Sequence, residues 1–459
     1  MKRFFIILTI LIMAASLLLS GCSLSDAGRE KELEDVLKTT YEELGSTFSG
    51  EEGSYSLVAE YLSSWAKKNS IEVTESDEHY IVLTNPATKN NGSSKSAVFQ
   101  CSLETSDMKS SVETLAIGMT ALLGPDSHGD ISLIVTENNN GEFTGAKALP
   151  EKYCGYDNLI NLTHSKDTKL LDEGAFEMTG KMSSEISMTV PSYSNAFAIT
   201  MSMPEFTDPF AFDKNYPNPV EVIGGLLATE KSSGKLFQIA SFECEETAGY
   251  NPSSATAIVV VDENNIESFT KKFEKSYENM EERFDKLEDD FVYTMTETSM
   301  PDYVMSNQSS DNIISLMYTL KTGIYLQEED SGLIVSASGI SSISTSGEEL
   351  NVTVTARSLM EETLDEMSCV FLTTSGLCDI EYEASDKRKL WTSDSKTSGF
   401  FREALELDET DQSSAVKSSE CELFAEKNHN LSIISYYCNM DKGQTALANL
   451  LHFTESLAK

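Results

Sequence analysis

The first half of the chain alternates helical and extended hydrophobic patterns. Apolar residues recur every three to four positions at 30–44, 54–68 and 112–123, which predicts three amphipathic helices. Ser54 stands where the second of these helices needs an N-cap. Short runs rich in β-branched and aromatic residues predict strands at 71–74, 80–84, 97–100, 131–136 and 158–162. Strands that alternate with helices in this way predict an α/β sheet layered by helices.

The pattern changes after Pro191. Strands are expected at 196–201, 238–242, 257–261, 320–336 and 350–356, and helices at 265–289 and 358–371. The tail returns to the first pattern, with helices at 398–407 and 444–457 around a strand at 431–437. This order predicts a discontinuous α/β domain, 30–191 and 386–459, which is interrupted by an inserted α+β domain at 192–385.

The N-terminus carries the most specific local motif. Lys2 and Arg3 precede an apolar stretch at 4–19 that is too short to span a membrane comfortably. Leu19-Ser20-Gly21-Cys22 then resembles the lipobox of a bacterial lipoprotein signal. An ordinary signal peptide or an anchor helix is the alternative interpretation.

The lipobox resemblance implies that residues 1–21 are removed, that Cys22 is lipidated and that 22–29 form a tether. Stable anchoring requires more than one acyl chain, as such a lipidated cysteine would carry. We therefore expect the protein to be exported and held by lipid on the bacterial cell membrane, facing outside the cytoplasm.

The chain is strongly acidic. Its 459 residues carry 34 Lys and Arg against 74 Asp and Glu, a formal net charge of −40. Removal of the signal would leave 32 positive against 74 negative charges, or −42. Nucleic-acid binding needs clustered Lys and Arg for the phosphates, and this balance argues against it. The seven cysteines besides Cys22 are odd in number and have no C-x-x-C spacing, so they do not describe a disulfide framework.

A series of short motifs resembles one enzyme family in their order along the chain. The motifs are Tyr41-Glu42-Glu43-Leu44, Tyr61-Leu62-x-x-Trp65, Asn85-Pro86-Ala87-Thr88, Ile117-Gly118, Thr144-Gly145-Ala146, Leu159-Ile160-Asn161-Leu162, Glu420-Cys421-x-Leu423-Phe424 and Ile433-Ile434-Ser435. Together they resemble the bacterial aminoacyl-histidine dipeptidases, zinc metallopeptidases of the carnosinase and aminoacylase type. The resemblance covers nearly the whole mature chain, although no single motif is specific. It implies a central mixed sheet flanked by helices, a pair of zinc ions, and an inserted domain that serves as a lid or as the contact of a homodimer.

The chain departs from that family at the zinc site. The family holds its zinc pair with two His and three carboxylates, and a Glu acts as general base. The corresponding positions are Ser102 for the first His, Glu104 for the Asp that orients it, Thr114 for the bridging Asp, Asn138 and Asn139 for a Glu-Glu pair, and Thr163 for the third carboxylate. Another family His falls at Val416, and residues 440–444 offer no counterpart to the last one. Most replacements are small and neutral, so we expect these positions to line an emptied metal pocket.

These replacements predict a pseudopeptidase without a metal cofactor, which binds a peptide or amino acid in the old cleft or serves as a scaffold. A divergent active metallodipeptidase that hydrolyses Xaa-His or other dipeptides is the alternative. Among the histidines, His164 follows Thr163 beside the expected pocket, whereas His128 is expected in a loop. Cys101 would need a neighbouring base to act as a nucleophile.

Overall fold

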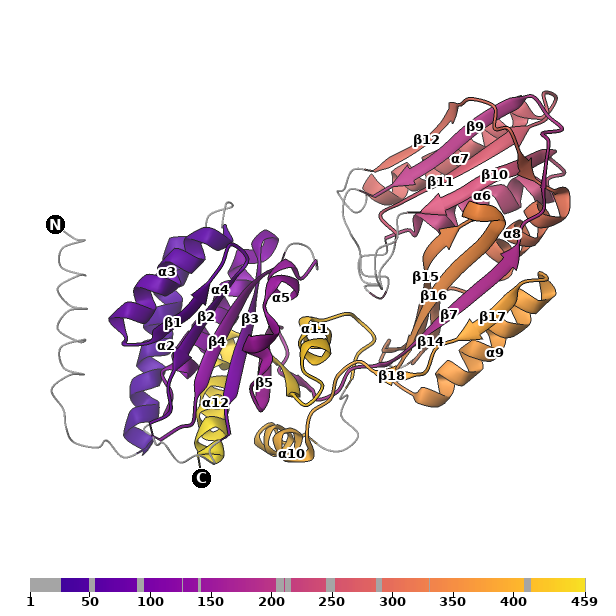
Figure 1. The fold of residues 1–459 in the computed structure, drawn as a ribbon. Coiled ribbons are helices and arrows are strands. Elements are labelled where there is room, and N and C mark those ends of the chain that lie inside the picture. Colours follow the sequence, from indigo (N-terminus) through magenta and orange to yellow (C-terminus); the bar gives the residue numbers. More distant parts are fainter. Residues whose placement is uncertain are drawn as a thin grey trace, which may run out of the picture.

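The chain forms two lobes, which Figure 1 shows side by side. The computed structural model describes residues 26–48, 54–88, 95–125, 127–138, 142–203, 210, 216–244, 252–285, 291–329, 331–407 and 414–458. The expected signal at 1–21, Cys22 and Asn139 lie outside the described residues. Within these ranges, none of the helices has the length and apolar character needed to cross a membrane.

A seven-stranded mixed sheet forms the centre of the first lobe. Its strands are β1 (Glu72–Ser76), β2 (Tyr80–Asn85), β3 (Ala97–Glu104), β4 (Ile131–Asn138), β5 (Asn158–His164), β6 (Lys169–Leu171) and β19 (Ser432–Cys438). Their order is β1-β2-β4-β3-β5-β19-β6, with the four strands from β4 to β19 parallel and the others antiparallel at the edges. The strand predicted to end at Gln100 continues to Glu104, so Ser102 and Glu104 lie within β3.

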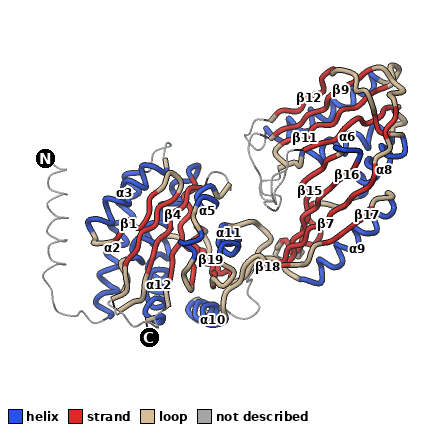
Figure 2. Tube along the Cα trace, in the orientation of Figure 1, coloured by secondary structure: helices blue, strands red, loops and turns tan. Residues whose placement is uncertain are grey.

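Helices cover both faces of this sheet (Figures 1 and 2). One face packs against α2 (Asp26–Phe48), α3 (Tyr55–Lys68), α4 (Met108–Leu122), α10 (Ser395–Ala404) and α12 (Gly443–Leu457), and the other against α5 (Thr144–Ala148) and α11 (Glu420–Lys427). Single 3-10 turns lie at Thr105–Asp107, Glu151–Cys154, Ser346–Glu348 and Met440–Lys442.

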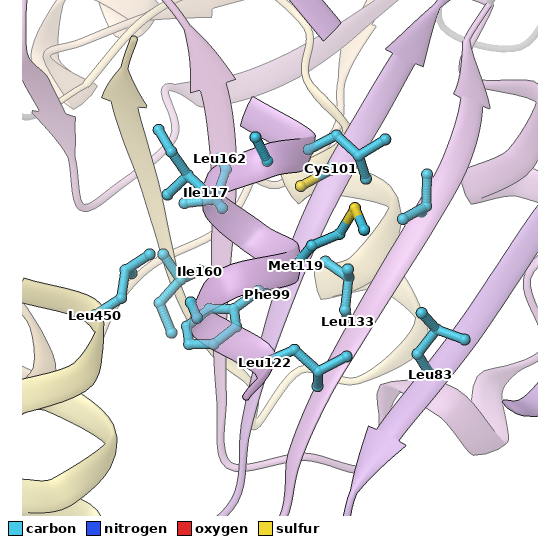
Figure 3. Close-up of a cluster of buried hydrophobic side chains, with 14 of the residues drawn as sticks. Leu83, Phe99, Cys101, Ile117, Met119, Leu122, Leu133, Ile160, Leu162 and Leu450 are labelled. Carbon is cyan, nitrogen blue, oxygen red and sulfur yellow. The ribbon is translucent and has the colours of Figure 1, made fainter. Parts of the chain in front are cut away.

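Helix α4 lies against the middle of the sheet, because its near-continuous apolar sequence is buried on almost every side. Figure 3 shows Ile117 and Met119 of α4 packed with Phe99 and Cys101 of β3. Gly118 allows the close approach, since a Cβ atom there would lie 2.8 Å from Cys101 Sγ.

The second lobe contains two antiparallel sheets. The six-stranded sheet has the order β14-β15-β16-β7-β17, with β18 also paired to β7, and the four-stranded sheet has the order β10-β11-β9-β12. The strands are β7 (Phe176–Glu185), β9 (Asn195–Ser202), β10 (Phe237–Cys244), β11 (Ser254–Val261), β12 (Val292–Glu297), β14 (Gly323–Gln327), β15 (Ile334–Ser344), β16 (Glu349–Ser358), β17 (Glu381–Ala384) and β18 (Arg388–Lys389), with a small pair β8 (Met188–Thr189) and β13 (Val304–Met305). The helices are α6 (Pro219–Ser232), α7 (Ile266–Asp285), α8 (Asn307–Thr319) and α9 (Glu361–Leu377).

The chain crosses between the lobes earlier than the sequence pattern predicted. β6 ends at Leu171 in the first sheet, and β7 begins at Phe176 in the sheet of the second lobe. The expected boundary at 191/192 therefore falls beyond β7. Its alternating residues, such as Met178 and Met182, face the core of the second lobe. The chain returns near β18, after which Leu390 packs in the core of the first lobe.

Candidate functional site

The central strands direct alternate side chains to opposite faces of the first sheet. Phe99, Cys101 and Leu103 of β3 belong to the core under α4. Gln100 and Ser102 therefore face α11, on the same side as Thr136 of β4, which Ser102 adjoins in the parallel register. Most of the positions predicted to line the metal pocket lie along this α11 face.

Polar side chains from five elements meet on that face, and all of them are buried except Thr163, which is half-buried. We call them the Glu420 cluster, which consists of Gln100, Thr136, Asn161, Thr163, Ser435 and Glu420. Gln100 Nε2 donates to Thr136 Oγ1 (2.9 Å) and to Glu420 Oε2 (2.5 Å). Thr136 Oγ1 in turn donates to Glu420 Oε1 (2.7 Å). These contacts hold both carboxylate oxygens of Glu420 in the interior.

The other half of the cluster is held by one amide. Asn161 Nδ2 donates to Gln100 Oε1, while the hydroxyls of Thr163 and Ser435 donate to Asn161 Oδ1 at 2.7 and 2.9 Å. Each member thus bonds to another member. A buried polar network of this kind is stable because its donors and acceptors are paired.

The Glu420 carboxyl is the ionisable group of this cluster. Burial raises its pKa to about 7, and the charge of Glu104 adds to the rise, while the side chains that bond to it act in the opposite direction. The residue is 3% exposed, so the carboxyl has little water to stabilise its charge. The raised pKa brings the titration of Glu420 into the neutral pH range.

Three predicted positions, Ser102, Glu104 and Asn138, lie outside the cluster at the ends of β3 and β4. Ser102 Oγ is buried without a hydrogen-bond partner among the described residues, although the hydroxyl lies close enough to Glu420 to help lower its pKa. Glu104 and Asn138 adjoin each other in the register of β3 and β4. Asn138 Oδ1 accepts a hydrogen bond from Phe143 N at 3.1 Å.

Thr114 does not join this group, contrary to the prediction. It lies within α4 on the opposite face of the sheet, and its Oγ1 donates to Ser111 O at 3.1 Å. The reason is that α4 already begins at Met108, so position 114 is buried inside a helix rather than at its start.

Strand alternation also separates His164 from Thr163. The His164 ring lies 3.6 Å from Glu113 Oε2 of α4, on the face opposite to the cluster. The nucleophile hypothesis for Cys101 fails for the same reason, because its thiol is fully buried under α4, and burial raises its pKa well above the usual range. His128 lies in the loop before β4 as expected, and its Nδ1 is 2.7 Å from Gly129 O.

Two features were missed by the sequence reasoning. Glu420 was used only as part of a family motif, and Gln100 only as the end of an expected strand. A Glu in the first turn of a short helix next to an apolar strand could have drawn attention to burial. The second feature is a surface pair in which His79 Nδ1 and Glu137 Oε2 are 2.6 Å apart, and this hydrogen bond raises the pKa of His79. Only the folded structure brings the members of either group together.

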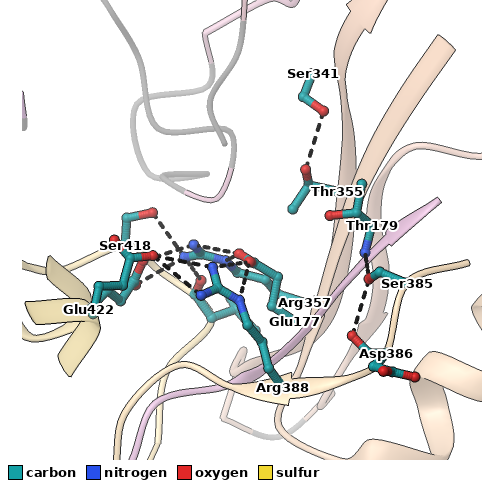
Figure 4. A network of polar contacts seen from close by, with 12 residues as sticks. Glu177, Thr179, Ser341, Thr355, Arg357, Ser385, Asp386, Arg388, Ser418 and Glu422 are labelled. Atoms are coloured by element: carbon teal, nitrogen blue, oxygen red, sulfur yellow. Dashed lines mark hydrogen bonds and ion pairs between the residues drawn. The ribbon is translucent and has the colours of Figure 1, made fainter. Parts of the chain in front are cut away.

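A buried ion network joins the two lobes beside α11 (Figure 4). Arg357 of β16, which is 4% exposed, donates to Glu177 Oε2 of β7 at 2.8 Å. The same guanidinium donates to both carboxylate oxygens of Glu422 of α11, at 3.1 and 2.8 Å. Arg388 adds a second cation, with Nη2 2.9 Å from Glu177 Oε1. Helix α11 therefore contacts the Glu420 cluster on one side and the second lobe on the other.

Val416, at a position where the family carries a His, is part of this junction. Its side chain is buried in the core of the first lobe, and its carbonyl accepts from Arg357 Nη1 at 3.3 Å. An apolar residue at this position suits a packing role between the lobes.

Comparison with known proteins identifies the architecture. No protein-family model and no curated protein matches the chain. The solved aminoacylhistidine dipeptidase of Vibrio alginolyticus is similar over 92% of this chain and 95% of its own, with 17% identity and a TM-score of 0.51. The chain has the fold of that dipeptidase. The match confirms the expected α/β fold class, with a mixed central sheet flanked by helices and an inserted α+β lobe.

Two further solved structures resemble the chain less closely. An aminopeptidase of Bacillus cereus has 13% identity, covers 93% of this chain and 99% of its own, and has a TM-score of 0.42. A tripeptidase of Staphylococcus aureus has 10% identity, covers 93% and 98%, and has a TM-score of 0.44.

The residues at the predicted zinc positions do not fit the zinc pair that the dipeptidase resemblance implies. Zinc in proteins is held by His, Cys or carboxylate ligands that converge on one point. In the part of the chain that the structure describes, no three His, Cys, Asp or Glu side chains form such a group. Glu104 alone brings a carboxylate to those positions, and the others offer hydroxyl or amide groups. Besides the carboxyl of Glu420, the members of the Glu420 cluster offer hydroxyl and amide groups, which are poor ligands for zinc.

Proposed function

We propose that the chain is a pseudopeptidase, an exported lipoprotein in which a dipeptidase fold works without zinc chemistry. In this proposal the protein binds a peptide or amino-acid ligand, or serves as a scaffold, and is anchored to the outer side of the cell membrane through Cys22. The activity named for the Vibrio alginolyticus structure would then be absent here.

The proposed loss of zinc chemistry rests on one observation. Ser102, Asn138 and Thr163 stand at positions that the family resemblance gives to zinc ligands or the general base. Thr163 belongs to the Glu420 cluster, whose members form hydrogen bonds with one another inside the protein. A carboxylate cluster without its metal would repel itself, so neutral residues that bond to one another relieve that cost.

Zinc content and turnover test this proposal directly. The mature chain without its lipidated Cys22, residues 23–459, is purified, passed through gel filtration with equimolar zinc, and analysed for retained metal. Dipeptide hydrolysis is then assayed with zinc or manganese. We expect no retained zinc and no turnover. Stoichiometric zinc with hydrolysis that a chelator abolishes would establish the metallodipeptidase alternative instead.

A pair of variants locates any metal that does bind. Glu104→Gln removes the carboxylate among the predicted positions, and Glu78→Gln removes one from the surface, where its side chain is 82% exposed. If Glu104→Gln abolishes zinc binding and Glu78→Gln does not, the zinc is bound at the predicted zinc positions, and the proposal is refuted. Zinc lost in neither variant would be bound elsewhere on this acidic surface.

Ligand binding and anchoring need separate measurements. A panel of dipeptides, longer peptides and free amino acids is screened for a rise in the thermal midpoint of the mature chain, as expected for a ligand that binds the folded state. If no compound shifts the midpoint, the binding role fails and the scaffold role stands. For the anchor, cells fed an alkyne-bearing fatty acid should label the full chain and not a Cys22→Ser variant.

A further inference from the structure

The outer side of α9 is a surface that the proposed function does not use. The inner side of the helix packs Leu364, Met367 and Phe371 into the core of the second lobe. On the outer side, the C-terminal half of α9 exposes no charged residue: Leu372 is 55% and Leu377 83% exposed, with small residues between them. Leu377 has the highest exposed fraction among the large hydrophobic residues that the structure describes.

A neighbouring helix enlarges this apolar area. Tyr318, at the end of α8, is 76% exposed. Thr319 Oγ1 lies 3.8 Å from Cys378 Sγ, the residue that follows α9, so the two helix ends are adjacent. Tyr318 therefore lies near the C-terminal end of α9, and we call Tyr318, Leu372, Leu377 and the exposed Cys369 the α9 surface.

The N-terminal half of the same helix side is acidic. Glu362, Asp365 and Glu366 are exposed there, one turn before the α9 surface begins. Lys387 lies 2.9 Å from Asp365 Oδ2 and 3.1 Å from Glu361 Oε1, which offsets part of the charge. The outer side of α9 therefore presents negative charge followed by apolar area along the helix.

This pattern decides which partner fits. Two copies of α9 in parallel would place acidic half on acidic half, and two antiparallel copies would cover the leucines with carboxylates. Both arrangements are unfavourable, and each copy also carries a net charge of −40. A helix with one apolar half and one Lys- or Arg-rich half matches both parts of the surface.

We propose that the outer side of α9 docks an amphipathic, basic helix of a partner protein. Leucines of the partner cover the α9 surface, and its cations lie over Glu362 and Glu366. The interface would bury apolar area at its centre and place charge at its edge, as protein interfaces do. The docking does not depend on the proposed loss of zinc chemistry, so either proposal can fail without the other.

Cys369 makes this docking measurable. Among the described cysteines it is the one classed as exposed, so a thiol reagent should modify it first in the mature chain. The probe is a synthetic helical peptide of about 20 residues, long enough to follow the 17 residues of α9, with leucines at helical spacing in one half and lysines in the other. We expect the peptide to protect Cys369 from modification and to bind in a salt-dependent manner.

Matched variants assign the binding to the surface. Leu372→Ala with Leu377→Ala should weaken peptide binding at least about tenfold, whereas Leu236→Ala, at a leucine 52% exposed elsewhere in the lobe, should leave it unchanged. Glu362→Gln with Glu366→Gln should weaken binding mainly at low salt. A control peptide with glutamates in place of lysines should not bind.

Three results would overturn the proposal. The first is a Cys369 that the lysine peptide leaves fully reactive, and the second is equal binding to the double leucine variant. In the third, Cys369 becomes protected when the concentration of the chain alone is raised and sedimentation shows a dimer, in which case a second copy is the occupant.

Discussion

Replacing Glu420 by Gln should remove a pH dependence of stability from the first lobe. In the folded protein the pKa of Glu420 is about 7, against an ordinary value of 4.5. Below pH 4.5 the group is protonated in both the folded and unfolded states and contributes nothing. As the pH rises above 4.5, the unfolded chain ionises first, so the folded state loses stability until the pH passes 7.

The size of the effect follows from these two pKa values. At about 1.4 kcal/mol per pH unit, the full difference corresponds to about 3 kcal/mol, of which about 2.5 kcal/mol falls between pH 5 and pH 8. The carboxyl is buried, so solvent screens little of this energy. Glu420→Gln has no proton to lose, and the difference in unfolding free energy between the two proteins should therefore change by about 2.5 kcal/mol over that pH range.

Tryptophan fluorescence in urea is the suitable assay. The chain has two tryptophans, Trp65 and Trp391, and both lie in cores of the lobe that contains Glu420. Comparing the two proteins at each pH cancels the titration of all other acidic groups. Glu403→Gln, at an exposed position of α10, is the control and should show no such trend. A difference between wild type and Glu420→Gln that stays constant from pH 5 to pH 8 would refute the reasoning.

Three further predictions concern other buried groups. Gly145→Ala should destabilise the first lobe by about 1–3 kcal/mol, because the added Cβ would lie 2.2 Å from His79 O. Gly155→Ala is the control, since its Cβ would have its nearest neighbour at 3.7 Å. Equal urea midpoints for the two variants would contradict the predicted clash. Glu230 of α6 has both carboxylate oxygens buried without a hydrogen-bond partner among the described residues, and burial raises its pKa to about 7. Glu230→Gln should therefore raise the thermal midpoint at pH 8 and leave it unchanged at pH 5, as measured by calorimetry. A rise of the midpoint at both pH 5 and pH 8 would show that the charge of Glu230 is not the cause. Arg357→Ala should cost about 3–5 kcal/mol, because it removes the buried cation that bridges Glu177 and Glu422 at the lobe junction. Increased protease cleavage near residues 172–176 is the readout. A variant as resistant as wild type would exclude the role of the ion network.

Much of the fold could be predicted from hydrophobic periodicity. The helix expected at 54–68 is α3, the strand at 131–136 is β4, and the helix at 358–371 overlaps α9. Periodicity succeeds there because each element buries one face, or both, against its own lobe. Periodicity failed to assign β7 to the second lobe. The alternation of apolar and polar residues along β7 would be the same in either sheet, and only the pairing with β16 decides to which sheet the strand belongs.

The residues at the predicted zinc positions were visible in the sequence, and so was the lack of charge at all of them except Glu104. A residue type is a local property, and therefore Ser102 and Thr163 could be recognised as poor zinc ligands without coordinates. Which side chains meet was decided by tertiary structure alone. Thr114 is turned away because α4 begins early, whereas Glu420 joins Gln100 although 320 positions separate them. The raised pKa of Glu420 also depends on the tertiary structure, because the carboxyl becomes buried only when α11 packs on the sheet.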